Sequence, residues 1–247
     1  MNANRMKALL ALERDVNAEL ERHAEAERAS GLHNNWPISD GVVDEALFLA
    51  TKPKMLWVLK EPWDVDEGEG EGGWSLTKAA IPRMLMEGSI GDKGTFANMA
   101  WVTYSVLNGF QTWGQMPYVS NEPKVGESLR RFAYINISKL PWQKVSYMPM
   151  LQACYERNKA MLLRQVEIIA PDIIIGGYTL PLFFSDFGLT QTDFTQGSET
   201  VSVCHRNGRL YVDAYHPACR FGSEKYVDDI VTAIKPFRQH WERAILT

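Results

Sequence analysis

Cysteine is scarce in this sequence, and its three residues lie far apart. Cys154, Cys204 and Cys219 form no C-x-x-C pair. This spacing argues against a zinc site, an iron–sulfur cluster or a disulfide framework. We therefore expect a protein without a metal or a cofactor.

Long apolar runs are missing as well. None approaches the roughly 20 residues that span a bilayer. The first 28 residues carry charges throughout, unlike a signal peptide. We expect a cytoplasmic monomer that makes no contact with a membrane.

Positive charge is not in excess. The sequence has 26 Lys and Arg against 30 Asp and Glu, which gives a net charge of −4. Proteins that bind polyanions through their overall charge are usually basic, so any contact with nucleic acid must depend on a local patch. Basic residues do gather between positions 124 and 144, and again at Arg206, Arg209, Arg220 and Lys225.

Several motifs of other enzyme classes are absent. The sequence has no G-x-S-x-G, no P-loop and no dinucleotide fingerprint, which argues against a serine hydrolase or nucleotide-binding enzyme on an open α/β sheet. The Gly-rich segment 64–73 is acidic, so it would repel phosphate, and it lacks the spacing of a calcium loop. We expect this segment to form a flexible loop beside a functional site.

Apolar segments and amphipathic segments alternate along the chain. Strands are expected at 55–59, 132–139, 172–177 and 209–215, and helices at 74–86, 96–107, 151–169, 179–187 and 226–241. This alternation predicts an α/β fold of three layers, α/β/α, with a central, mostly parallel four-stranded sheet. Residues 1–30 form an N-terminal helix that packs on or extends from the domain, and residues 31–247 form the domain itself.

Polar residues stand at the exits of three predicted strands. They are the pair Lys60 and Glu61 before Pro62, then Asn136, and then His216 before Pro217. The carboxyl ends of parallel strands meet at one edge of a sheet, where open α/β folds bind ligands. A carboxylate, an amide and an imidazole that converge there could bind and hydrolyse a substrate.

The order of these motifs resembles the uracil-DNA glycosylase superfamily over roughly residues 53–240. Segment 59–63 (LKEPW) is similar to the family's GQDPY or GEAPG segment, and segment 134–139 (YINISK) to the strand whose Asn reads the base. Segment 169–177 (IAPDIIIGG) resembles the third-strand unit, and segment 214–218 (AYHPA) resembles the His-Pro-Ser ending except at Ala218.

The resemblance implies a role for each matching residue. Glu61 would activate water, and His216 would stabilise the leaving base. Base contacts are implied for Asn136, Trp63 and Trp74. Lys60, which stands beside Glu61, is a further candidate for contact with the base. Arg220 and Phe221 are placed like the loop that wedges into the duplex. Apart from the resemblance, DNA binding by a chain of negative net charge requires a basic face near His216, and we expect Lys139, Lys144, Arg206 and Arg220 to form it.

The resemblance thus implies a monofunctional DNA glycosylase that takes part in base excision. It would flip a base out of DNA and hydrolyse its N-glycosidic bond, leaving an abasic site. Lys60, the acidic insertion at 65–73 and the missing HPSPLS ending depart from the family pattern. The substrate would therefore be uracil or, given these departures, a modified pyrimidine such as a modified cytosine of phage DNA. A modified substrate of that kind would indicate a role in anti-phage defence. The alternative is a catalytically inactive nucleic-acid-binding module on the same fold.

Overall fold

The computed structural model of this chain describes residues 3–29, 36–64, 71–141, 146–218 and 220–242. The α-helices are α1 (Ala3–Ala29), α2 (Glu45–Ala50), α3 (Ile81–Glu87), α4 (Thr95–Leu107), α5 (Pro123–Glu127), α6 (Met148–Ile169), α7 (Phe184–Phe187), α8 (Ser223–Ile234) and α9 (Gln239–Glu242). The strands are β1 (Gly41–Val42), β2 (Met55–Leu59), β3 (Phe132–Asn136), β4 (Ile173–Gly177), β5 (Thr195–Gln196), β6 (Ser202–Arg206) and β7 (Arg209–Ala214).

The strands form one mixed sheet in the order β1-β3-β2-β4-β7-β6-β5. The central strands β3, β2, β4 and β7 are parallel, whereas β1, β6 and β5 pair antiparallel. The predicted α/β class and parallel centre are confirmed, but the prediction of four strands is wrong, since the described residues form seven. Two added strands, β1 and β5, have only two residues each and are too short for a pattern of side-chain alternation.

The four predicted strands are the most apolar segments of the sheet. Every residue of β2, β3 and β4 is buried, as expected for strands covered on both faces. β2 has the predicted bounds, while β3 ends three residues early, at Asn136. Its pairing with the β2 segment continues, because the N–H groups of Ile137 and Ser138 donate to Leu59 and Lys60 at 2.9 Å.

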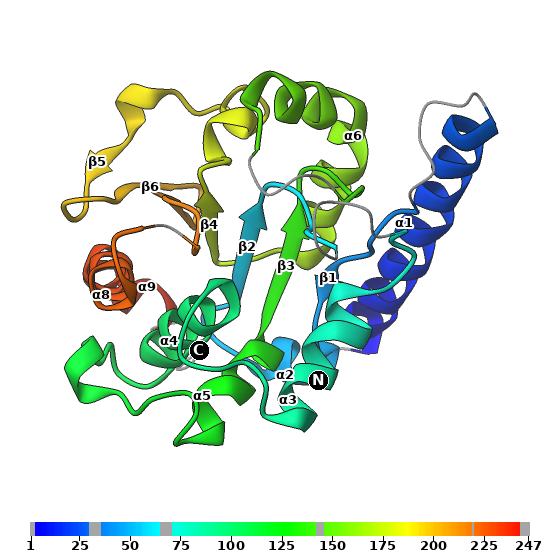
Figure 1. Ribbon diagram of the computed structural model, residues 1–247. Coiled ribbons are helices and arrows are strands. Elements are labelled where there is room, and N and C mark those ends of the chain that lie inside the picture. The colour runs from blue at the N-terminus through cyan, green and yellow to red at the C-terminus, as the bar shows by residue number, and fades with distance from the viewer. Residues whose placement is uncertain (1–2, 30–35, 65–70, 142–145, 219, 243–247) are drawn as a thin grey trace.

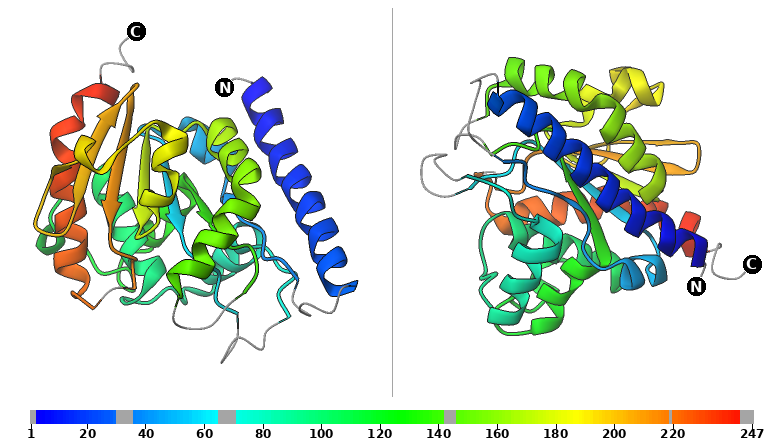
Figure 2. Two further views of the ribbon diagram at one scale, coloured as in Figure 1. Left: turned by 90° about the horizontal axis from the view of Figure 1, so that it is seen from above. Right: turned by 90° about the vertical axis from the view of Figure 1, so that its right-hand side faces the viewer.

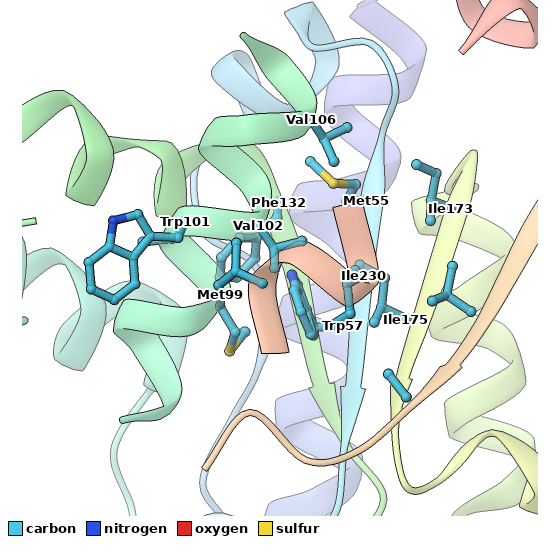
Figure 3. Close-up of a cluster of buried hydrophobic side chains, with 14 of the residues drawn as sticks. Met55, Trp57, Met99, Trp101, Val102, Val106, Phe132, Ile173, Ile175 and Ile230 are labelled. Atoms are coloured by element: carbon cyan, nitrogen blue, oxygen red, sulfur yellow. The ribbon is translucent and has the colours of Figure 1, made fainter. Parts of the chain in front are cut away.

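Helices cover both faces of the sheet, which gives three layers (Figure 1). On one face, α4 and α8 pack against alternate residues of the central strands. Figure 3 shows this cluster, with Trp57 of β2 and Ile175 of β4 near Ile230 of α8. On the other face, α2 and α6 pack against the intervening residues. We name these the α4/α8 face and the α6 face.

The N-terminal helix α1 covers Ala3–Ala29 of the expected range 1–30, whose other residues lie outside the described part, and it packs on the domain. Leu9, Leu12, Val16 and Leu20 are buried in the cluster on the α6 face, and α1 runs beside α6 in both views of Figure 2. Arg5 of α1 also donates to the backbone oxygen of Ile169, at the end of α6, at 3.2 Å. The helix therefore belongs to the body of the domain.

The direction of the strand connections reverses at the centre of the sheet. The chain passes from β2 outward to β3, returns to β4 on the opposite side of β2, and continues to β7. In open α/β sheets, ligands bind at the carboxyl ends of the strands on either side of such a reversal, here β2 and β4. Within the described ranges, no helix combines the length and apolar character needed to cross a membrane.

Candidate functional site

Lys60, Glu61, Asn136 and His216 all lie at the carboxyl edge of the parallel strands. Asn136 is the last residue of β3 and pairs with Leu59 of β2, so Glu61 follows two residues beyond that row. His216 follows β7 by two residues, just past Ala214, which pairs with Gly177. Side chains alternate between the two faces of a strand. Counted along β2, β3 and β7, the positions of Glu61, Asn136 and His216 continue the series of residues on the α4/α8 face. The expected convergence at one edge agrees with this placement.

The two glycines that end β4 make room for different neighbours. A Cβ atom at Gly176 would lie only 2.8 Å from the backbone nitrogen of Leu180, so the chain after β4 can turn this closely only past a glycine. A Cβ atom at Gly177 would collide with the Leu59 side chain, while its 3.4 Å distance to the Cα atom of His216 is an ordinary contact. The Gly-Gly exit seen in the sequence therefore accommodates Leu180 and Leu59.

The side chain of Asn136 is fully buried and only partly satisfied. The Tyr134 hydroxyl donates to Asn136 Oδ1 at 3.0 Å, which orients the amide. Its Nδ2 has no hydrogen-bond partner among the described residues. A buried donor left unpaired costs about 1–3 kcal/mol, so this amide is suited to a ligand oxygen.

A buried ion pair holds the backbone of Asn136 in place. The Asp40 carboxylate accepts the Asn136 N–H at 2.8 Å and the Lys139 ammonium at 2.7 Å. Gln165 of α6 closes the network, because its Nε2 donates to Asp40 and its Oε1 accepts from Lys139, both at 3.0 Å. All three network side chains are buried. Sequence reasoning missed Asp40 and Gln165, since neither stands in a recognisable motif.

The network corrects one predicted DNA contact. Lys139 was expected at a basic surface, but it is only 1% exposed and its ammonium bonds to Asp40 and Gln165. Burial lowers the pKa of Lys139, while the Asp40 charge opposes that shift. A buried ammonium cannot reach DNA phosphates, so Lys139 is a structural residue of the site.

Glu61 lies in a partly desolvated position. Burial raises the pKa of its carboxyl group, and both a hydrogen bond with the Ser146 side chain and the charge of Lys60 oppose that shift. A carboxylate with a raised pKa is a stronger base than one in water. Glu61 is therefore suited to accept a proton from a water molecule.

The His216 ring has a defined tautomer. Its Nδ1 accepts the backbone N–H of Ala218 at 3.1 Å, so the neutral ring carries its proton on Nε2. Burial, assisted by the positive charge of Lys60, lowers the pKa of His216 to about 4. At neutral pH the ring is an uncharged hydrogen-bond donor.

The two predicted aromatic base contacts differ in their surroundings. Trp63 is 53% exposed, so it does not form a buried pocket wall. Trp74 is half-buried, packs against the cluster on the α4/α8 face, and lines a hollow of about 690 Å³ that α1 helps to form. The backbone oxygen of Trp74 accepts the N–H of Ser39, the residue before Asp40. This hydrogen bond links the Trp74 segment to the network of Asp40, Lys139 and Gln165.

The other predicted DNA-binding residues fall into different places. Lys144 lies outside the described residues. Arg206 pairs with Arg209, the first residue of β7, so it lies roughly 20 Å from His216, at the opposite edge of the sheet. Its expected place near His216 is wrong, and it forms an ion pair with Asp193 at 3.4 Å. Arg220 and Phe221 are exposed in the turn that follows His216.

In the part of the chain that the structure describes, no group of three or more His, Cys, Asp or Glu side chains could hold a metal ion. Cys154 and Cys204 are buried free thiols, and Cys219 lies outside the described residues.

In comparisons with known proteins, no protein-family model matches the chain and no curated protein matches its sequence. Its function is therefore inferred from the arrangement of its own residues.

Proposed function

We propose that this protein is a monofunctional DNA glycosylase, similar to the uracil-DNA glycosylase superfamily. It would flip a base out of DNA and hydrolyse its N-glycosidic bond, leaving an abasic site. The observation that supports this proposal most strongly is the buried amide of Asn136, whose Nδ2 has no hydrogen-bond partner among the described residues. Asn136 ends β3 at the edge of the sheet where Glu61 follows β2 and the neutral His216 follows β7.

The proposed chemistry assigns a role to each of these groups. Cleavage of an N-glycosidic bond leaves an anionic base and an oxocarbenium-like sugar. His216 would donate a hydrogen bond from Nε2 to the developing negative charge on the base oxygen. Glu61 would stabilise the positive sugar and accept a proton from the attacking water, as its raised pKa favours.

Asn136 supports a base that carries a keto oxygen. Its oriented Nδ2 can donate to such an oxygen, while Oδ1 already accepts the Tyr134 hydroxyl. Uracil and other pyrimidines with a keto group present this acceptor. The sequence departures at Lys60 and at 65–73 favour a modified pyrimidine, with the modified cytosines of phage DNA as one class. We further propose that the protein acts in the cytoplasm, as a monomer.

Mass spectrometry of released bases tests this function. The protein is incubated with DNA that contains uracil, damaged pyrimidines or phage-type modified cytosines, and the free bases are identified. We expect one pyrimidine to be released and an abasic site to remain. Tight binding to DNA without release of any base from the panel would contradict the enzyme and favour the inactive nucleic-acid-binding module.

A further inference from the structure

Exposed aromatic side chains concentrate at the carboxyl edge of the sheet. Among the described residues, six large aromatic side chains are exposed: Trp63, Tyr118, Tyr147, Tyr178, Tyr215 and Phe221. All but Tyr118 belong to connections that follow a parallel strand. Exposed aromatic groups that gather beside a candidate site indicate an interaction surface.

Three of these rings and one cation form a continuous row. The rings of Tyr178 and Tyr215 are nearly parallel, at 16° and with centroids 6.1 Å apart. Phe221 packs edge-on against Tyr215 with centroids 4.8 Å apart. The Lys60 ammonium lies 5.0 Å from the centroid of the Tyr178 ring. We name these three aromatic residues the aromatic row.

The row is distinct from the proposed hydrolysis site. Its three rings take no part in the proposed bond cleavage, and Tyr178 follows β4, which carries none of the hydrolytic groups. The row and the hydrolytic groups nevertheless share one edge, because Lys60 precedes Glu61 and Tyr215 precedes His216. A strand whose flipped base enters the site could therefore continue over the row.

Tyr178 shows that the exposed ring has a structural cost. Its φ is 65°, in the left-handed region that bulky residues seldom adopt and that costs about 1–3 kcal/mol. Its N–H donates to the Ala214 oxygen at 2.8 Å, which holds this conformation, while the ring is 51% exposed. Because the backbone that carries the ring is already fixed, binding of a ligand to the ring need not order this part of the chain.

We propose that the aromatic row binds the unpaired bases of single-stranded DNA, so that the enzyme prefers single-stranded to duplex substrate. The choice of DNA as the ligand rests on the proposed function. Flat exposed rings suit the faces of unstacked bases, and base–aromatic stacking tolerates any sequence. Lys60 beside the row and Arg220 next to Phe221 supply positive charge for the phosphates.

Fluorescence anisotropy tests the proposal. It measures how tightly the protein binds a fluorescein-labelled oligothymidylate of about 15 nucleotides and a duplex of equal length. The wild type should prefer the single strand. Tyr178→Asn, which tolerates positive φ, and Tyr215→Ser should each weaken that binding by about 5- to 150-fold. Tyr178→Phe keeps the ring and should retain affinity. Tyr118→Ser removes an exposed ring remote from the parallel-strand exits and is the matched control.

The outcomes separate this inference from the proposed function. Unchanged binding by Tyr178→Asn and Tyr215→Ser, with thermal melting like the wild type, would overturn the aromatic row even if the wild type releases bases. Equal losses in Tyr178→Phe and Tyr178→Asn would also overturn it, because the hydroxyl rather than the ring would then matter. Selective loss with no base released from any DNA would support the row and contradict the glycosylase.

Discussion

The Asp40 carboxylate accepts the backbone N–H of Asn136 at 2.8 Å. This contact fixes the end of β3 from a segment that precedes β1. The same carboxylate is paired with the buried Lys139, so the placement of the proposed base-reading residue depends on an ion pair within the core. The stability and the activity of the protein should therefore respond differently to changes in this pair.

Replacing one member of the pair should destabilise the fold strongly. Lys139→Met leaves the Asp40 charge buried and unpaired, which typically costs about 3–5 kcal/mol. The double variant Asp40→Leu/Lys139→Met removes both charges and should regain most of the lost free energy of unfolding while releasing bases more slowly. Urea denaturation measures the stability. As the control, Lys225→Met removes a surface lysine that pairs with Glu199 and Asp229, and it should lower the stability far less than Lys139→Met.

Substitution of Asn136 should alter which base is accepted. Asn136→Asp replaces the Nδ2 donor by an acceptor, so a keto oxygen would lose its partner and meet a negative charge. We expect the substrate of the wild type to be released about 10²- to 10³-fold more slowly, the usual effect of losing one hydrogen-bond donor to a substrate oxygen. Competition between two bases in one DNA, read by mass spectrometry, measures the change. An unchanged ratio would contradict the assigned role.

The pH dependence of base release follows from two shifted groups. Release requires ionised Glu61, whose pKa burial raises, and neutral His216, whose pKa is about 4. The rate should be constant above neutral pH and should fall as the pH drops, first because Glu61 gains a proton and then, near pH 4, because His216 does. A rate that instead rises below neutral pH would show that His216 acts as a charged acid.

Asp213 should reduce stability at neutral pH. Burial raises its pKa to about 6, so the folded state binds this proton more tightly than the unfolded state, whose pKa is near 3.9. Stability linked to this group is therefore lost as the pH rises from about 4 to 6. Asp213→Asn should gain about 1–2 kcal/mol at pH 7, after allowance for solvent screening, and little at pH 4. The exposed Glu87→Gln should change neither value.

The parts of the fold that depend on local pattern could be predicted from the sequence. Continuous burial of β2 and β4 gives uniformly apolar runs. Asn207-Gly208 is a typical hairpin turn, and both residues have positive φ, but the strand β6 before it was not expected, since only two of its five residues are buried. The short strands β1 and β5 could not be predicted, because two residues carry no periodicity.

The candidate site shows the same division. The exits at Glu61, Asn136 and His216 could be placed at one edge, because parallel strands end together. Lys139 could not be assigned correctly, since its burial depends on Asp40 and Gln165, which are 99 and 26 residues away along the chain. The mistaken position of Arg206 has a similar cause, because only the antiparallel register of β6 reveals which end of the sheet it occupies.

The most direct test of the proposed activity is the single-turnover rate of base release by Glu61→Gln, on a DNA substrate that the wild type cleaves. The substitution keeps the size of the side chain and removes the carboxylate. We expect unchanged affinity for DNA, measured in parallel by anisotropy, and a release rate about 10²- to 10⁴-fold lower. A release rate equal to that of the wild type would contradict the assignment of Glu61 and the hydrolytic site built around it.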